Sequence, residues 1–246
     1  MTLGDYSLYF GLTLILSTLF AMGGVGSAIA LVPSFSMLGM TIDLAKSLGL
    51  FVNTASTVTA SVMNFRRGVL DFRFALPLVV SILIATPIGA WSSQFVARPV
   101  IEGLLIAFLI TAALLLLFSR RTTLVTYTRS WPLYLIGGSV GVISGMLGVG
   151  GGSLMMPALI LLGYDAKKSA RAISFVIPFS SAGAFLTYLS FTAMNWPLLA
   201  TVAVAAILGG YLGERIMHNR LNPAQIKKLI AVLLLLMAAK MLWNFA

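Results

Sequence analysis

The sequence contains no cysteine, and this absence excludes disulfide bonds, thiolate metal sites and cysteine nucleophiles. Charged residues are also scarce, at 9% of 246 residues, against about 25% in an ordinary soluble domain. The single histidine, His218, has no second ligand at a metal-binding spacing, and neither an HExxH nor a GxSxG motif occurs. We therefore expect no metal, no cofactor and no catalytic residues, and the chain is not predicted to be an enzyme.

Apolar residues are abundant instead, at 59% of the chain, with a mean hydropathy of +1.02. Long uncharged stretches recur throughout, and a membrane-spanning helix takes about 20 residues. The formal net charge of +10 comes from short basic clusters between the apolar segments, which is typical of topology signals and not of a nucleic-acid surface. The sequence predicts an all-α integral membrane protein that contacts the lipid bilayer and no nucleic acid.

Ten apolar segments are expected, at 6–22, 27–40, 47–64, 74–95, 100–118, 132–147, 152–163, 172–191, 197–213 and 225–245. The second and seventh are too short to span a bilayer alone, and each follows a glycine cluster. A basic stretch, 119–131, separates two halves of similar length. We expect a first repeat at 1–118, a cytoplasmic linker at 119–131 and a second repeat at 132–246, within one transmembrane domain.

The two halves repeat one pattern at a fixed spacing of 157 − 33 = 124 residues, which places Pro33 on Pro157. Leucine matches between membrane helices carry little information, because composition alone produces them. Glycine and proline matches are harder to obtain by chance, and several keep this register: Gly24 with Gly148, Gly26 with Gly150, Gly89 with Gly213, and Pro99 with Pro223. The halves are therefore predicted to be structural repeats.

Loop charges indicate that the repeats are inverted. The loop at 64–73 carries three arginines, whereas its equivalent at 188–197 carries no charge. The loops at 164–171 and 214–228 are basic, whereas their first-half equivalents have few basic residues. Since cytoplasmic loops collect Lys and Arg, the two halves are expected to face opposite sides of the membrane.

Inversion requires an odd number of crossings in each half, so residues 132–163 and 6–40 must each form a hairpin that turns at its glycine cluster. We expect about eight membrane segments, each repeat being a Gly-turn hairpin plus three transmembrane helices. Whether each hairpin is re-entrant or makes two full crossings stays open. Both termini are predicted to be non-cytoplasmic.

Glycine clusters at membrane depth predict an anion site. A helix that starts after such a turn directs its free N–H groups and the positive end of its dipole at the turn. Irregular backbone is tolerated there only where protein or water supplies partners. The alternative is that the glycines simply allow close helix packing. The candidate binding residues at the turns are Gly24, Gly26, Ser27, Gly150, Gly151, Gly152 and Ser153.

The duplicated motifs resemble a known family. GGVGSAIALVP and GVGGGSLMMP are each followed by a polar helix, KSLGLFVNTAS in the first half and ARAISFVIPFSS in the second. Over nearly the whole chain this pattern resembles the sulfite exporter TauE/SafE family of membrane permeases. The resemblance implies a substrate among sulfite, organosulfonates and related small sulfur oxyanions. One departure is Ser27, which stands where the second turn has Gly151.

Polar residues inside the helix after each hairpin are further candidates for substrate binding, because burying them in a membrane is costly unless they are paired or used. Asn53 carries two amide donors suited to a sulfonate oxygen. The alternative for the hydroxyl residues is a bond back to their own helix. The candidates are Asn53, Thr54 and Ser56 in the first half, and Ser174, Ser180 and Ser181 in the second.

Lys46 and Arg171 stand at nearly equivalent positions, each at the start of a polar helix. They could attract an anion, but we expect them to snorkel toward the lipid headgroups.

The sequence is interpreted as a secondary transporter that moves a small sulfur-containing anion, of the sulfite or organosulfonate class, across the cell membrane by alternating access. The alternatives are a passive anion channel and a membrane scaffold without transport. The expected partners are a small anionic substrate and the lipid bilayer, and a homodimer stays open. The expected location is the bacterial inner (cell) membrane, as a multi-pass protein.

Overall fold

The computed structural model describes residues 3–23, 26–66, 71–118, 131–161, 164, 166–219 and 223–245. Within them every regular element is helical. The first half forms α1 (Leu3–Gly23), α2 (Ala28–Met37), α3 (Ile42–Arg66), α4 (Phe72–Ser92), the 3-10 turn η1 (Ser93–Phe95) and α5 (Arg98–Phe118). The second half forms α6 (Trp131–Leu147), α7 (Gly152–Leu161), α8 (Ala166–Leu189), α9 (Trp196–Asn219) and α10 (Pro223–Phe245). The predicted all-α class is confirmed.

Five stretches in the described helices are long and apolar enough to cross a bilayer: Gly4–Met22, Phe72–Phe95, Arg98–Leu115, Ala172–Leu189 and Trp196–Gly213. This is fewer than the expected eight or so membrane segments, in which each Gly-turn hairpin counts as one. The difference arises because α6 and α10 offer shorter apolar stretches, and α3 is interrupted by polar residues. Helices α2 and α7 have 10 residues each. At 1.5 Å per residue they are about 15 Å long, half a hydrocarbon layer, as the sequence predicted.

The outer surface of the helices is apolar. Leucine and isoleucine side chains on α4, α6, α8 and α10 are 59–66% exposed: Leu76, Ile84, Leu135, Leu186 and Leu236. Soluble monomers rarely expose apolar surface on this scale, whereas acyl chains in a bilayer cover it at no cost. Together with the candidate spans, this surface defines a multi-pass membrane protein.

Helix boundaries recur between the halves at the spacing read from the sequence. Helix α2 begins at residue 28 and α7 at residue 152, so that 152 − 28 = 124. The same holds for α3 and α8, where 166 − 42 = 124, and for α4 and α9, where 196 − 72 = 124. Helices α5 and α10 are offset by one more residue, since 223 − 98 = 125. Each α-helix of the first half thus has a counterpart in the second half whose label is higher by five, so that α2 corresponds to α7 and α3 to α8.

Helix contacts recur in the same way. Helix α1 packs along α9, and its counterpart α6 packs along α4. Helix α3 contacts α9 as α8 contacts α4, and α2 contacts α3 as α7 contacts α8. The two remaining large contacts, α3 with α8 and α5 with α10, each join a helix to its own counterpart. Exchanging the halves therefore leaves the pattern of large contacts unchanged, as a two-fold axis between α3 and α8 would require.

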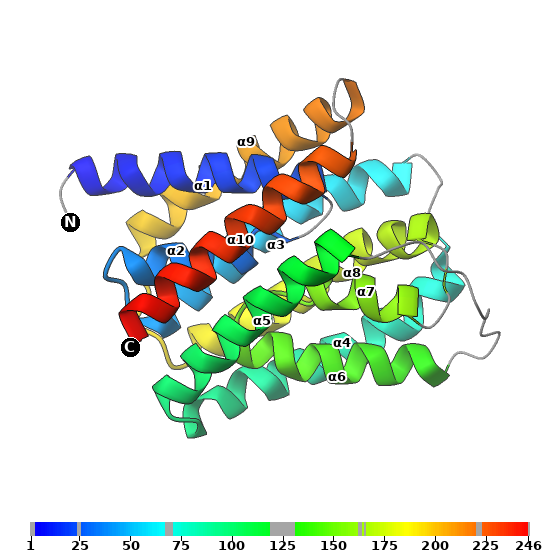
Figure 1. Ribbon diagram of the computed structural model, residues 1–246, viewed down its shortest axis with the longest axis horizontal. Helices are drawn as coiled ribbons and strands as arrows, with labels where there is room; N and C mark the ends of the chain where they lie inside the picture. Colours follow the sequence, from blue (N-terminus) through cyan, green and yellow to red (C-terminus); the bar gives the residue numbers. More distant parts are fainter. Residues whose placement is uncertain are drawn as a thin grey trace.

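Figure 1 shows the direction of these helices. Helix α1 starts at the left end of the molecule, where the N-terminus is marked, and α10 ends at the left, where the C-terminus is marked. Helix α9 runs from left to right, whereas its counterpart α4 runs from right to left. Helices α5 and α10 lie side by side and run in opposite directions (Figure 1). The described ends of the chain thus lie on one side of the molecule.

Two apolar cores flank the contact between α3 and α8. The larger core draws on α1, α2, α3, α5, α9 and α10, and the smaller one on α4, α6, α7 and α8. Several fully buried polar side chains lie on the two facing helices instead of in either core, among them Asn53, Ser180 and Ser181. The polar positions picked out in the sequence therefore gather where the halves meet.

Glycines allow α4 and α6 to approach closely. A Cβ at Gly89 of α4 would collide with the backbone carbonyl of Val142 in α6, and one at Gly145 of α6 would collide with that of Thr86 in α4. Carbonyl oxygens cannot move aside as a flexible side chain can, so a methyl group at either position forces the helices apart. Small residues at helix contacts are a common device in membrane proteins, where dispersion replaces the hydrophobic effect.

We expect Gly89→Ala to destabilise the protein by about 1–3 kcal/mol, the usual range for overpacking. The matched control is Gly103→Ala in α5, where an added Cβ meets nothing within 4 Å. Thermal unfolding in detergent gives the Tm of both variants. A Tm for Gly89→Ala equal to that of the control would contradict the close approach of α4 and α6.

Candidate functional site

Asn53 occupies the middle of α3 and is fully buried. Its amide Nδ2 donates to the hydroxyl Oγ of Ser181 in α8 at 2.7 Å. The bond joins the central helix of the first half to its counterpart in the second. Two residues predicted separately from the sequence are thereby brought into direct contact.

Both glycine turns reach the Asn53 amide. A Cβ built on Gly26 would lie 2.5 Å from Asn53 Oδ1, and one built on Gly150 would lie 2.5 Å from Asn53 Nδ2 and 2.9 Å from Ser181 Oγ. Gly150 also has a φ of +72°, in the left-handed region that favours glycine. The hairpins of the two halves therefore converge on one side chain, and glycine is what lets them do so.

The amide of Asn53 retains unused hydrogen-bonding capacity. Its Oδ1 is buried and has no hydrogen-bond partner among the described residues. The Ser181 hydroxyl both donates and accepts, so an amide turned by 180° would stay bonded to Ser181 and present Nδ2 instead. The pair can thus offer a ligand either an acceptor or a donor. An unpaired buried polar atom costs about 1–3 kcal/mol, which a ligand bonded to it would recover.

Ser27 adds a second unused group next to the first turn. It precedes α2 as its N-cap residue, but its hydroxyl makes no capping bond and is buried without a partner among the described residues. The N–H groups of the first helical turn have no acceptor within their own helix. The start of α2 therefore offers a hydroxyl and the positive end of a helix dipole beside Gly26.

A second polar contact lies at the other turn. The backbone N–H of Gly151 donates to Ser180 Oγ at 3.3 Å, and that oxygen lies 3.3 Å from the hydroxyl of Thr86 in α4. Sequence reasoning missed Thr86, although a buried threonine within an apolar span is the signal that could have found it. Because Ser180 is already bonded to the turn, it fixes the α6–α7 connection against α8.

Other predicted residues make hydrogen bonds or packing contacts within the protein. The hydroxyls of Thr54 and Ser56 bond back to Leu50 and Asn53 of their own helix, which was the alternative given for them. Gly152 lies against Ile177 of α8, where an added Cβ would collide with that side chain. Ser174 lies nearer the N-terminal end of α8 than Ser180 and Ser181, and its carbonyl accepts from the hydroxyl of Ser61 in α3.

Two predicted positions lie outside what the structure describes. Gly24 is not among the described residues, and of Ser153 only the backbone position in α7 is described. Their assignment stays a prediction from the sequence.

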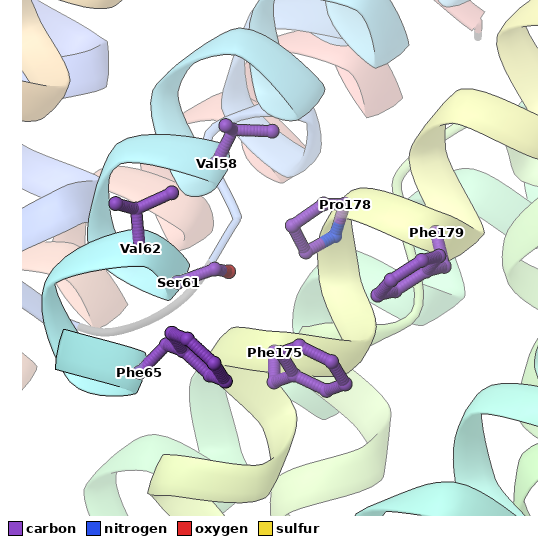
Figure 2. A pocket seen from close by; sticks show the side chains of 7 residues that line it. All are labelled: Val58, Ser61, Val62, Phe65, Phe175, Pro178 and Phe179. Carbon is purple, nitrogen blue, oxygen red and sulfur yellow. The ribbon is translucent and has the colours of Figure 1, made fainter. Parts of the chain in front are cut away.

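A cavity of about 240 Å³ lies between α3 and α8, beyond Asn53 toward the end of α3 (Figure 2). Its walls are apolar except for the Ser61 hydroxyl, and its lining residues are Val58, Ser61, Val62, Phe65, Phe175, Pro178 and Phe179. The ring of Phe72 contacts those of Phe65 and Phe175, with centroids 6.0 and 5.8 Å apart. Ser61 lies eight residues after Asn53, about 12 Å along the helix.

The snorkelling predicted for Lys46 is wrong. The side chain is fully buried, and its ammonium Nζ donates to the backbone carbonyl of Met146 at 3.0 Å. It points across to α6 because the Gly148 turn leaves room for its stem. The side chain of Arg171 lies outside the described residues.

The arrangement suits reversible binding of a small polar ligand. It combines hydroxyls, an amide and helix N-termini, which are neutral donors and acceptors. No group of three or more His, Cys, Asp or Glu side chains within the described ranges could hold a metal ion. The arrangement therefore offers hydrogen bonds and a fixed dipole field to a ligand at the contact between the halves.

These features place the protein in the class of membrane transporters. A family model described as "Sulfite exporter TauE/SafE" matches residues 9–241, and the chain belongs to this family. It is 24% identical to the "Probable membrane transporter protein YunE" of Bacillus subtilis, over 95% of this chain and 96% of that protein. It is 21% identical to the "Probable membrane transporter protein MJ0441" of Methanocaldococcus jannaschii, over 93% and 91%. Family and relatives indicate a transporter and not an enzyme.

A double-mutant cycle tests the contact between Asn53 and Ser181. Single changes to alanine each leave a buried polar group without its partner, whereas the double variant removes both groups. We expect a coupling free energy of about 0.6–1.7 kcal/mol, between the average and the maximum measured for hydrogen bonds between membrane helices. Unfolding of the four proteins in detergent gives this value. Strictly additive effects would show that the two side chains are not bonded.

Proposed function

We propose that this protein is a secondary transporter that moves a small sulfur-containing anion, of the sulfite or organosulfonate class, across the cell membrane by alternating access. The observation that carries the proposal is Asn53, held between the glycine turns of both halves. A ligand bound there would touch both repeats at once. That is the position from which a substrate can bias the movement of one half against the other.

The available donors favour an anion. Amide and hydroxyl groups donate to oxyanions, and α2 and α7 both begin beside the Asn53 amide, so their dipoles add positive potential from both hairpins. The description of the family as sulfite exporters supports a pyramidal or tetrahedral sulfur oxyanion in this place.

Inverted repeats supply the mechanism. What supports them is the exchange symmetry of the helix contacts, the opposite directions of paired helices in Figure 1 and the reversed loop charges in the sequence. Both turns meet α3 at its midpoint, which favours re-entrant hairpins over full crossings. Rocking about the contact between α3 and α8 would then open the site to each side in turn.

We further propose two repeats, 1–118 and 132–246, joined by a cytoplasmic linker at 119–131, in the bacterial inner membrane. The ends of α3 and α9 and the beginning of α8 lie on the side opposite the marked termini (Figure 1), and the basic loops follow or precede them. By the positive-inside rule this side is cytoplasmic, and both termini are non-cytoplasmic.

Transport is tested in proteoliposomes with labelled sulfite outside and unlabelled sulfite inside. Uptake by counterflow should saturate. Gly150→Leu should abolish it, because a side chain there would collide with Asn53 Nδ2 and Ser181 Oγ. Asn53→Ala should lower it about tenfold or more, as expected for one buried hydrogen-bonding group.

The matched control is Gly138→Ala in α6, where an added Cβ meets nothing within 4 Å. This variant should transport normally. Normal transport by both Gly150→Leu and Asn53→Ala would contradict the assignment of the binding site to these residues. Uptake that never saturates would identify a channel, and the absence of any uptake of sulfite or sulfonates would favour a scaffold.

Membrane topology is tested with single cysteines, since the natural chain has none. An impermeant maleimide should label Ala193→Cys, in the exposed connection between α8 and α9, on intact cells. Thr123→Cys, in the linker, should react only after the membrane is permeabilised. The reverse pattern would invert the proposed orientation, and equal labelling of both would contradict the inverted repeats.

A further inference from the structure

Lys46 is the only charged side chain that is fully buried among the side chains that the structure describes. It lies in the first turns of α3, on the helix that carries Asn53. Burying a charged lysine inside a membrane protein costs free energy unless the charge is paired or has a function. Asp43, three residues earlier, is half-buried, and its carboxylate acts on Lys46 through a Coulombic interaction.

Two contacts of Lys46 favour its ammonium form against the cost of burial. Nζ donates to the carbonyl of Met146, near the C-terminal end of α6, where the helix dipole is negative. Nζ also lies 5.3 Å from the centre of the Tyr188 ring, within the range of a cation–π interaction. Both contacts stabilise a positive charge.

The hydrogen bond alone does not account for a lysine at this position. The Met146 carbonyl also accepts from the Tyr188 hydroxyl at 2.9 Å, so it would remain bonded without Lys46. The stem of Lys46 fills the space beside Gly148, which an uncharged methionine of similar length would fill equally well. What the lysine adds is its charge.

The geometry connects this charge to the candidate site. Lys46 and Asn53 are seven residues apart on one face of α3, about 10 Å along the helix. The α6–α7 turn follows the same face, since Gly148 lies against Lys46 and Gly150 against Asn53. Buried protein fills this space, so the field of the ammonium is screened far less than it would be at a surface.

We propose that Lys46 is a charge-selectivity residue of the anion site, which acts on the bound anion through space and does not contact it. This inference rests on the proposed anion transport and deepens it. A field acts in proportion to the ligand's charge, so Lys46 favours anions over neutral ligands and dianions over monoanions of similar size.

The test compares the binding of sulfate, with two charges, and methanesulfonate, with one, by isothermal titration calorimetry of the full chain in detergent at pH 7. A unit charge at about 10 Å in an effective dielectric constant of about 20 changes affinity for a monoanion on the order of tenfold. Lys46→Met should weaken methanesulfonate binding by roughly that factor, and sulfate binding by roughly its square, about a hundredfold. Lys46→Arg should keep the preference for sulfate.

Tyr188→Phe is the control for a structural role. It removes the hydroxyl bonded to Met146 but keeps the ring and the charge, so any loss it causes should be equal for the two anions. Equal losses in Lys46→Met would show that Lys46 only supports the turn and would overturn the inference while leaving the anion site intact. Failure of both Lys46→Met and Lys46→Gln to fold would overturn it as well. A natural protein that binds neither anion would contradict the proposed function, and the inference would fall with it.

Discussion

Hydrocarbon offers no hydrogen-bond partner, so any backbone that leaves the helix at membrane depth must find one within the protein. Both hairpins of this chain make such a departure, at the turns before α2 and α7. The second turn is bonded to Ser180 of α8, and both turns lie against the amide of Asn53 in α3. Because the two central helices hold the turns, α3 and α8 must carry polar residues and must lie together. The rest of the helical arrangement follows from that contact.

The central contact also explains why the polar residues divide into two kinds. Ser180 is already bonded to the protein, and it fixes the turn. Asn53 Oδ1 and the Ser27 hydroxyl are buried without a partner among the described residues, although their neighbours are well packed. A site that binds and releases a ligand needs such unused groups, because groups fully satisfied by the protein would have nothing to gain from the ligand.

The charged and polar groups where α3 meets α8 differ between the two halves, even though the helix contacts of the two halves are equivalent. Lys46 lies against the second turn, whereas the position 124 residues later is Ala170. The first turn has Ser27 where the second has Gly151, so one turn contributes a hydroxyl and the other a bare backbone. Duplicated halves can thus share one architecture and still present a ligand with different groups on its two sides.

Composition and the glycine and proline register determined the all-α class, the order and approximate positions of the helices and the short helices α2 and α7, because hydropathy and helix-breaking residues act locally. The exact boundaries differed, since α3 begins at residue 42 and α8 at residue 166, five and six residues before the predicted segments. They also selected Asn53 and Ser181, since polar residues in apolar helices are costly. The hydroxyls of Thr54 and Ser56 bond to their own helix, whereas that of Ser180 contacts another helix. The sequence could not tell these two cases apart, because a polar residue within an apolar helix gives the same pattern in either case. Only the tertiary structure placed Gly26 and Gly150 on the same amide, and only it buried Lys46, because a long side chain reaches lipid headgroups or a neighbouring helix according to what packs beside it.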